Sequence, residues 1–235
     1  MVQSAHSVER PDSLALKLYK RRWLVIVAGV AIMCLILLCT WLAWPRTVRH
    51  LNSDATLARS GLIGAWNKGN IIVLVRHAER CDRSSSACLG DADGITQDGL
   101  GVATTVGKAL QSLGIERTDV LSSTATRGMQ TTQAMFSQPV AAQDWLYSCI
   151  NRKGTHDLLA TVATHKNPER NLVLITHSQC IDAVEMQLGI RSSQTTVPGY
   201  VAALFVRVNE HGSKPRLVGY ANAADWASMH LPDAH

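Results

Sequence analysis

The sequence lacks several features that would place it in other classes of protein. It contains no internal repeat and no low-complexity tract, which excludes repeat arrays and low-complexity polymers. No set of Asp, Glu and His residues has the spacing of a metal site, so we expect neither a metal nor another cofactor. At 235 residues, the chain is long enough for one sizeable domain with a full hydrophobic core.

Net charge is also absent from most of the chain. Residues 1–50 contain seven Lys or Arg and two Asp or Glu, whereas residues 51–235 contain sixteen of each kind. The overall charge of +5 therefore belongs to the N-terminal segment. This distribution argues against a broad basic face, and we expect no nucleic-acid partner.

Charged residues are missing altogether from the 21-residue run Leu24 to Trp44, which is long enough to span a bilayer. Tryptophans lie at its ends, as interfacial aromatic residues do (Trp23, Trp41 and Trp44). Four basic residues precede the run and two follow it closely (Lys17, Lys20, Arg21 and Arg22; Arg46 and Arg49). The positive-inside rule then predicts a cytoplasmic basic tail (1–22), an inner-membrane anchor (23–44) and a periplasmic remainder. The alternative is a cleaved signal peptide with a free periplasmic domain, but its apolar core would be shorter.

The cysteines are consistent with export. Cys34 and Cys39 lie in the apolar run, and four others lie in the following part, where three pairings are possible. Cys81 with Cys88 would close a short polar loop and is the natural local pair, which leaves Cys149 with Cys180. An oxidising compartment favours both bridges, and four reduced thiols are the alternative.

The pattern of apolar residues predicts a tether over residues 45–69 and a domain over residues 70–235. Short apolar runs predict buried strands, and longer segments with helical spacing predict helices between them. The expected strands are 71–75, 120–121, 172–175 and 201–208, with 216–220 as an antiparallel partner of the last. The expected helices run from Thr96 to Gly114, over 125–136 and 154–165, and after His177 to about Leu188. This alternation is typical of an α/β fold, a mostly parallel sheet between two layers of helices.

Polar side chains follow three of these strands directly. They are Arg76-His77 with Arg80, Ser122-Ser123 leading to Arg127, and Thr176-His177. Because the carboxyl ends of parallel strands meet at one edge of a sheet, we expect the three groups to converge. Three arginines and two histidines in one place form a positive pocket that is costly unless an anion fills it.

The ordered set resembles the histidine phosphatase superfamily, which has the phosphoglycerate mutase-like fold. The strand–Arg-His core, the Ser-x-x-x-x-Arg segment ending at Arg127, and the strand–Thr-His element occur in the superfamily's order. Gly94-Ile95-Thr96 with Gly99 is similar to its Leu-Thr-x-x-Gly helix start. The string Arg76 to Ser84, together with the positions of the cysteines, is similar to a branch that acts on phosphorylated sugars of lipopolysaccharide, and this similarity supports the two-bridge interpretation.

The resemblance implies a metal-independent phosphomonoesterase that works through a phosphohistidine intermediate. His77 would be the nucleophile, and its imidazole must be neutral to present a lone pair to phosphorus. Arg76, Arg80 and Arg127 would bind the phosphate oxygens with their forked donors, and His177 would donate a further hydrogen bond in the pocket. The implied substrate is a phosphorylated sugar of the lipopolysaccharide core or a related envelope sugar phosphate.

The proton donor to the leaving group is not apparent. Many members of the superfamily carry a Glu at the position occupied here by Ser148. Glu79 and Asp144 are candidates, and a good leaving group would make a donor unnecessary. The missing acid leaves open a phosphate-binding sensor without turnover, and the resemblance leaves open a second alternative, a phosphatase for phosphohistidine proteins. The predicted export argues against the second, because such proteins are cytosolic.

Overall fold

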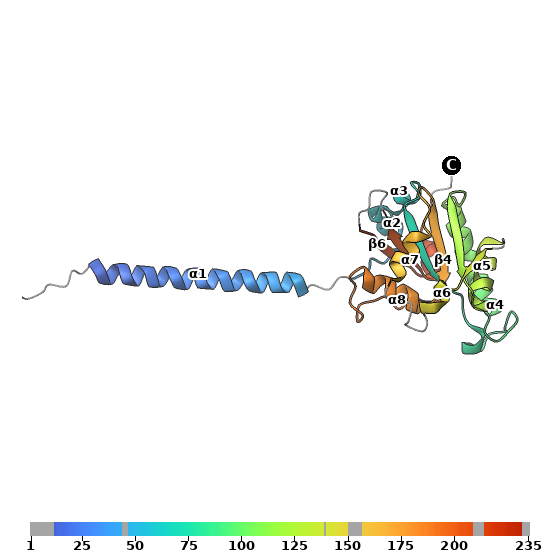
Figure 1. The fold of residues 1–235 in the computed structure, drawn as a ribbon, viewed down its shortest axis with the longest axis horizontal. Helices are drawn as coiled ribbons and strands as arrows, with labels where there is room; N and C mark the ends of the chain where they lie inside the picture. Colours follow the sequence, from blue (N-terminus) through green and yellow to red (C-terminus); the bar gives the residue numbers. More distant parts are fainter. Residues whose placement is uncertain (1–11, 44–46, 139, 150–156, 209–213, 232–235) are drawn as a thin grey trace, which may run out of the picture. The chain divides into compact units, whose positions relative to one another are not determined.

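The N-terminal unit of the chain contains one long helix. The computed structural model describes residues 12–43, 47–138, 140–149, 157–208 and 214–231, and the chain divides into units of residues 1–45 and 46–235. Helix α1 spans Asp12–Ala43, and its stretch Leu16–Trp41 is long and apolar enough to cross a membrane (Figure 1). At about 1.5 Å per residue, this stretch exceeds the roughly 30 Å of a bilayer's hydrocarbon core. Trp44 and residues 1–11 of the expected tail lie outside the described residues.

The second unit is built on a six-stranded sheet with the order β3-β2-β4-β1-β5-β6. The four parallel strands are β1 (Ile71–Arg76), β2 (Thr118–Ser123), β3 (Ala141–Gln143) and β4 (Asn171–Thr176). The strands β5 (Ala203–Arg207) and β6 (Arg216–Ala221) are antiparallel, β5 to β1 and β6 to β5. The predicted mostly parallel sheet is therefore confirmed, and so is the antiparallel pairing of the last two strands of the chain.

Helices cover both faces of the sheet, which gives the expected three layers (Figure 1). In β1, Ile71, Val73 and Val75 pack on one face, and Ile72 and Leu74 on the other. This alternation with burial on both sides is what a central parallel strand requires. The first face carries α2 (Asp54–Ser60), α3 (Leu62–Trp66), α4 (Gln97–Ser112), α5 (Thr126–Phe136) and the 3-10 helix η3 (Ala223–Ser228). The second carries α6 (Trp145–Ser148), α7 (Leu158–Thr164) and α8 (Ser178–Gln187).

The expected tether over residues 45–69 is wrong for its described part, 47–69, because these residues belong to the folded unit. Leu51 is fully buried, and Leu57, Leu62 and Trp66 join the core. The stretch is mostly polar, and its core residues recur only every four to six positions, so the sequence shows no helical or strand period there. Residues 45 and 46 lie outside the described residues.

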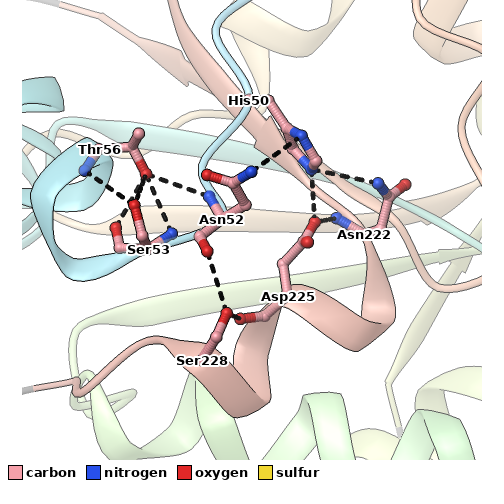
Figure 2. A network of polar contacts seen from close by, with 7 residues as sticks. All are labelled: His50, Asn52, Ser53, Thr56, Asn222, Asp225 and Ser228. Atoms are coloured by element: carbon pink, nitrogen blue, oxygen red, sulfur yellow. Dashed lines mark hydrogen bonds and ion pairs between the residues drawn. The ribbon is translucent and has the colours of Figure 1, made fainter.

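A network of polar contacts fixes the same stretch to the end of the chain. Figure 2 shows His50 in contact with Asp225 and Asn222. The Nε2 atom of His50 lies 2.7 Å from Oδ2 of Asp225. The Ser228 hydroxyl donates to the Asn52 carbonyl at 3.0 Å, and Ser53 forms a capping box with Thr56 at the start of α2. The chain therefore enters the domain along β6 and η3, well before residue 70.

Some short elements differ from expectation. The strand β3 and the helix α6 were not predicted, because three or four residues are too few to show a period. Helix α7 begins at Leu158, and residues 154–156 of the helix expected there lie outside the described residues. Helices α4, α5 and α8 lie where the spacing predicted them.

Candidate functional site

The two predicted histidines lie side by side at the carboxyl edge of the sheet. Arg76 at the end of β1 is paired with Thr176 at the end of β4, so the residues that follow leave the sheet together. The His77 backbone N–H donates to the Thr176 carbonyl at 2.9 Å. The centroids of the His77 and His177 rings are 5.1 Å apart, with an angle of 61° between the ring planes. The expected convergence is therefore present.

His77 is held in one tautomer. Its Nδ1 lies 2.8 Å from the carbonyl oxygen of Ala78, and because a carbonyl only accepts, Nδ1 carries the hydrogen. The lone pair of the neutral ring is then on Nε2. Burial lowers the pKa of His77 to about 3, and the charges of Arg127, Arg76 and Arg80 act in the same direction against the hydrogen bond to Ala78. The ring is neutral at any physiological pH, as a nitrogen nucleophile must be.

His177 is buried and also neutral. Burial, followed by His77 and the nearby arginines, lowers its pKa to about 3. Its Nδ1 lies 3.5 Å from a terminal nitrogen of Arg127, and because a guanidinium only donates, Nδ1 accepts. Its Nε2 then carries the hydrogen and donates to the Ser123 hydroxyl, 2.9 Å away at the end of β2. Of the two serines left open by the sequence, Ser123 is the one that contacts this histidine.

Arg76 and Arg127 are charged groups largely removed from water. Desolvation by burial lowers the pKa of both, although a guanidinium remains charged. Arg76 donates from Nη1 to the Pro198 carbonyl at 2.6 Å, and its guanidinium carbon lies 4.1 Å from the centroid of the Tyr200 ring. The Nε atoms of both arginines are buried, with no hydrogen-bond partner in the described part of the chain. Such groups are suited to receive an anion.

Arg80 differs from the other two arginines because its guanidinium group already contacts a carboxylate at two points. Its Nε donates to Oδ1 of Asp82 at 2.7 Å, and its Nη2 contacts Oδ2 of the same carboxylate. These hydrogen bonds to Asp82 raise the pKa of Arg80. The positive charge of Arg80 still acts on both histidines. The sequence did not predict this pairing, although the two residues are only two positions apart.

In the part of the chain that the structure describes, no contact orients Glu79 or Asp144, the two candidate proton donors, toward the histidines. The carboxylate of Glu79 accepts from the Thr96 hydroxyl at 2.9 Å, and the same hydroxyl caps α4 by accepting from the Gly99 N–H. Glu79 is thus part of the junction between the β1 loop and α4. Asp144 is exposed at the start of α6, and the Ser148 hydroxyl donates to the Trp145 carbonyl.

Two supports of the site come from α5. The Thr131 hydroxyl accepts from the Ala78 N–H at 2.9 Å, which positions the loop after His77. The Gln130 side-chain oxygen accepts from the Ile95 N–H at 2.8 Å. Gln130 and Thr131 lie three and four residues after Arg127 on the same helix, so helical spacing could have placed them on its face.

Two tyrosines at the site were not predicted. The Tyr147 ring lies 5.7 Å from the His177 ring, and the Tyr200 ring lies 5.8 Å from the His77 ring, between centroids. Both sit in short or irregular segments that carry no periodic signal.

Both predicted disulfides are present beside the site. Cys81–Cys88 closes the loop directly after Arg80, and Cys149–Cys180 joins the end of α6 to the first turn of α8. The Cα atoms are 5.3 Å apart in each bridge. The described residues contain no cluster of three or more His, Cys, Asp or Glu side chains suited to a metal.

Comparison with known proteins finds relatives that match most of this chain. The lipopolysaccharide core heptose(II)-phosphate phosphatase of Escherichia fergusonii is 32% identical over 160 residues, covering 68% of this chain and 79% of the relative. The protein of the same name from Shigella boydii serotype 4 is 30% identical over 210 residues, covering 88% of this chain and 90% of the relative. No family model matches the sequence. Phosphoglycerate mutase from Bacillus anthracis str. Sterne superposes with a TM-score of 0.49 at 12% identity, over 69% of this chain and 98% of its own.

Proposed function

The chain belongs to the family of the lipopolysaccharide core heptose(II)-phosphate phosphatases, and we propose that it removes phosphate from a heptose of the lipopolysaccharide core or a related envelope sugar phosphate. The observation that carries the proposal is the pair of neutral histidines beside Arg76, Arg80 and Arg127. This combination provides a nucleophile and a strong field for a phosphoryl group in one place.

We assign the nucleophile to Nε2 of His77. The lone pair on this atom attacks phosphorus, a P–N bond forms, and the P–O bond to the sugar breaks. The sugar oxygen leaves with the bonding electrons and takes a proton from solvent water. Water then attacks the phosphohistidine, the P–N bond breaks, and inorganic phosphate and neutral His77 are restored. The hydrogen bond from Nδ1 to Ala78 keeps the reacting lone pair on Nε2 before the attack.

The arginines are assigned to the phosphoryl oxygens, and His177 is assigned to holding Arg127 beside them, because its one N–H already donates to Ser123. The transferring group spreads negative charge over its oxygens, and preorganised donors stabilise that charge without reorganisation. Arg76 and Arg127 have desolvated guanidinium groups, which strengthens their interaction with an anion. Arg80 contributes its charge from a position fixed by Asp82. The scheme uses only side chains of this chain, and we propose that it needs no metal.

We further propose that residues 23–44 anchor the chain in the inner membrane with the phosphatase domain in the periplasm. Support comes from the helix that includes Leu16–Trp41, from the excess of basic residues before it, and from the two disulfides of the folded unit. This placement brings the domain to the compartment that envelope sugars occupy.

The test is hydrolysis of a generic aryl phosphate by the full chain in detergent. His77→Ala should lower kcat by at least about a thousandfold, because the covalent route is lost. Val197→Ala, at a side chain that is 94% exposed, is the matched control and should keep wild-type activity. A chelator should leave the rate unchanged.

Three other results would contradict parts of this proposal. Full activity of His77→Ala would contradict the mechanism, and loss of activity in chelator would contradict metal independence. A phosphoryl group retained without turnover would instead favour the sensor function that the missing acid leaves open.

A further inference from the structure

An exposed aromatic ring stands beside the buried His177. Tyr147 is 40% exposed, and its ring plane makes an angle of 80° with that of His177 at a centroid distance of 5.7 Å. An aromatic side chain in such a position has a free apolar surface next to the phosphate pocket. No step of the proposed mechanism uses it.

Tyr147 is rigidly presented. It lies on α6, whose Leu146 carbonyl accepts a hydrogen bond at 3.1 Å from the hydroxyl of Thr176, the residue immediately before His177. Two residues after Tyr147, Cys149 is bonded to Cys180 in α8. Leu146 and Cys149 are fully buried, while Tyr147 between them is exposed. The four-residue helix α6 is therefore anchored on both sides of Tyr147, and these anchors fix the position of the exposed ring.

Tyr200 stands beside the other histidine, and it is also held in place. Its ring carries the guanidinium of Arg76, and the fully buried carboxylate of Glu185 accepts from the N–H and the hydroxyl of Thr196 at 2.7 and 2.6 Å. Val201, directly after Tyr200, has φ of +58°. A β-branched residue in the left-handed region is strained, and such strain persists where the surroundings demand a particular chain path.

The two tyrosines reach the site from opposite flanks of the β4–β1 pair. Tyr147 follows β3, at one edge of the sheet, and Tyr200 precedes β5, on the other side of β1. Because β5 is antiparallel to β1, its beginning lies at the carboxyl edge where the histidines lie. A phosphate held between the histidines would carry its organic group out past these rings.

We propose that Tyr147 and Tyr200 form a subsite for the sugar ring of the substrate, with Tyr147 as the stacking surface. The inference rests on the proposed phosphatase function and adds the residues that select a ring. The apolar C–H face of a pyranose can pack on an aromatic ring while its hydroxyls stay in water. Tyr200 contributes mainly by holding Arg76.

The experiment compares two phosphate esters of primary alcohols, glucose 6-phosphate and glycerol 3-phosphate, with the full chain in detergent. The leaving groups are chemically alike, so the ratio of kcat/KM values reports the ring alone. Tyr147→Leu should lower this ratio about tenfold, mainly through KM, which corresponds to about 1.4 kcal/mol. Tyr147→Phe should keep the ratio, because the ring and not the hydroxyl is required. Val197→Ala should match the wild type on both substrates.

The other possible outcomes contradict the subsite, the stacking role of Tyr147 or the phosphatase function itself. If the wild type hydrolyses both esters and Tyr147→Leu leaves the ratio unchanged, the subsite is wrong and the phosphatase function stands. If Tyr147→Phe loses kcat on both substrates, the hydroxyl is a proton donor and the stacking role is wrong. If the wild type hydrolyses neither ester and forms no phosphohistidine, the proposed function itself fails.

Discussion

His77 and His177 are unusual at the residue scale because folding keeps both rings neutral. Burial lowers the pKa of each to about 3, whereas a histidine in the unfolded chain has a pKa of about 6.5. Between these values the unfolded chain binds protons that the folded chain does not. The stability is therefore fully present above about pH 6.5 and falls as the pH is lowered toward 3.

Because the pKa of both histidines is lowered in the folded chain, the free energy of unfolding should fall as the pH is lowered. When the pH is lowered from 7.5 to 5, each of the two histidines should lower the free energy of unfolding of the wild type by on the order of 2 kcal/mol. His177→Asn should lose less over the same interval, because one of the two groups is gone, and His77→Asn should show the same reduction. Urea unfolding of the domain, followed by near-UV circular dichroism in detergent, measures the difference. Equal losses in the wild type and both variants would contradict the assignment.

The residues that carry the proposed chemistry could largely be predicted from the sequence. His77, His177, Arg76, Arg80 and Arg127 follow strands or begin a helix, and parallel strands bring such positions together by geometry alone. The tyrosines of the subsite could not be predicted in this way. Tyr147 lies on a helix of four residues and Tyr200 in an irregular segment, so their places depend on the tertiary structure.

At the scale of elements, the packing of α4 on α5 depends on Gly107. A Cβ atom at Gly107 would lie 2.5 Å from the Met135 Cα, which no real contact permits. The Gln111 side chain also donates to the Met135 carbonyl at 2.6 Å, so the two helices are held close together. Since α5 carries Arg127 and Thr131, this contact also sets the position of the site.

Gly107→Ala should therefore destabilise the domain by roughly 1–3 kcal/mol, because the helices must separate. Gly101 lies on the same helix, and a Cβ atom added there would have no other atom within 4 Å. Gly101→Ala should therefore stabilise the domain by up to about 1 kcal/mol through helix propensity. Thermal unfolding of the two variants, recorded side by side, measures the contrast. Equal shifts in the same direction would contradict the close contact.

Elements were predictable where a period or a buried run was long enough. Ile71–Val75 and Leu172–Ile175 are continuous apolar runs, and both are central strands. The segment 47–66 was misjudged, because its helices are seven and five residues long and its first residues pair with β6, which is distant in the sequence. Contacts between the two ends of a domain leave no local signal in the sequence.

At the scale of the whole molecule, one apolar helix precedes one phosphatase domain, and the basic charge lies with the helix. In the proposed arrangement, the anchor restricts the domain to substrates near the membrane surface, and the subsite selects a phosphorylated ring. The central claim is that this arrangement removes a phosphate from the lipopolysaccharide core by way of His77.

The most direct test expresses the full chain in an Escherichia coli strain that lacks its own lipopolysaccharide core heptose(II)-phosphate phosphatase. Mass spectrometry of the lipid A–core then shows whether a phosphate is lost. The wild-type chain should lower the core mass by one phosphate group, and His77→Ala, expressed at the same level, should leave the mass unchanged. An unchanged mass with the active wild-type chain, or an equal loss of phosphate with His77→Ala, would contradict the claim.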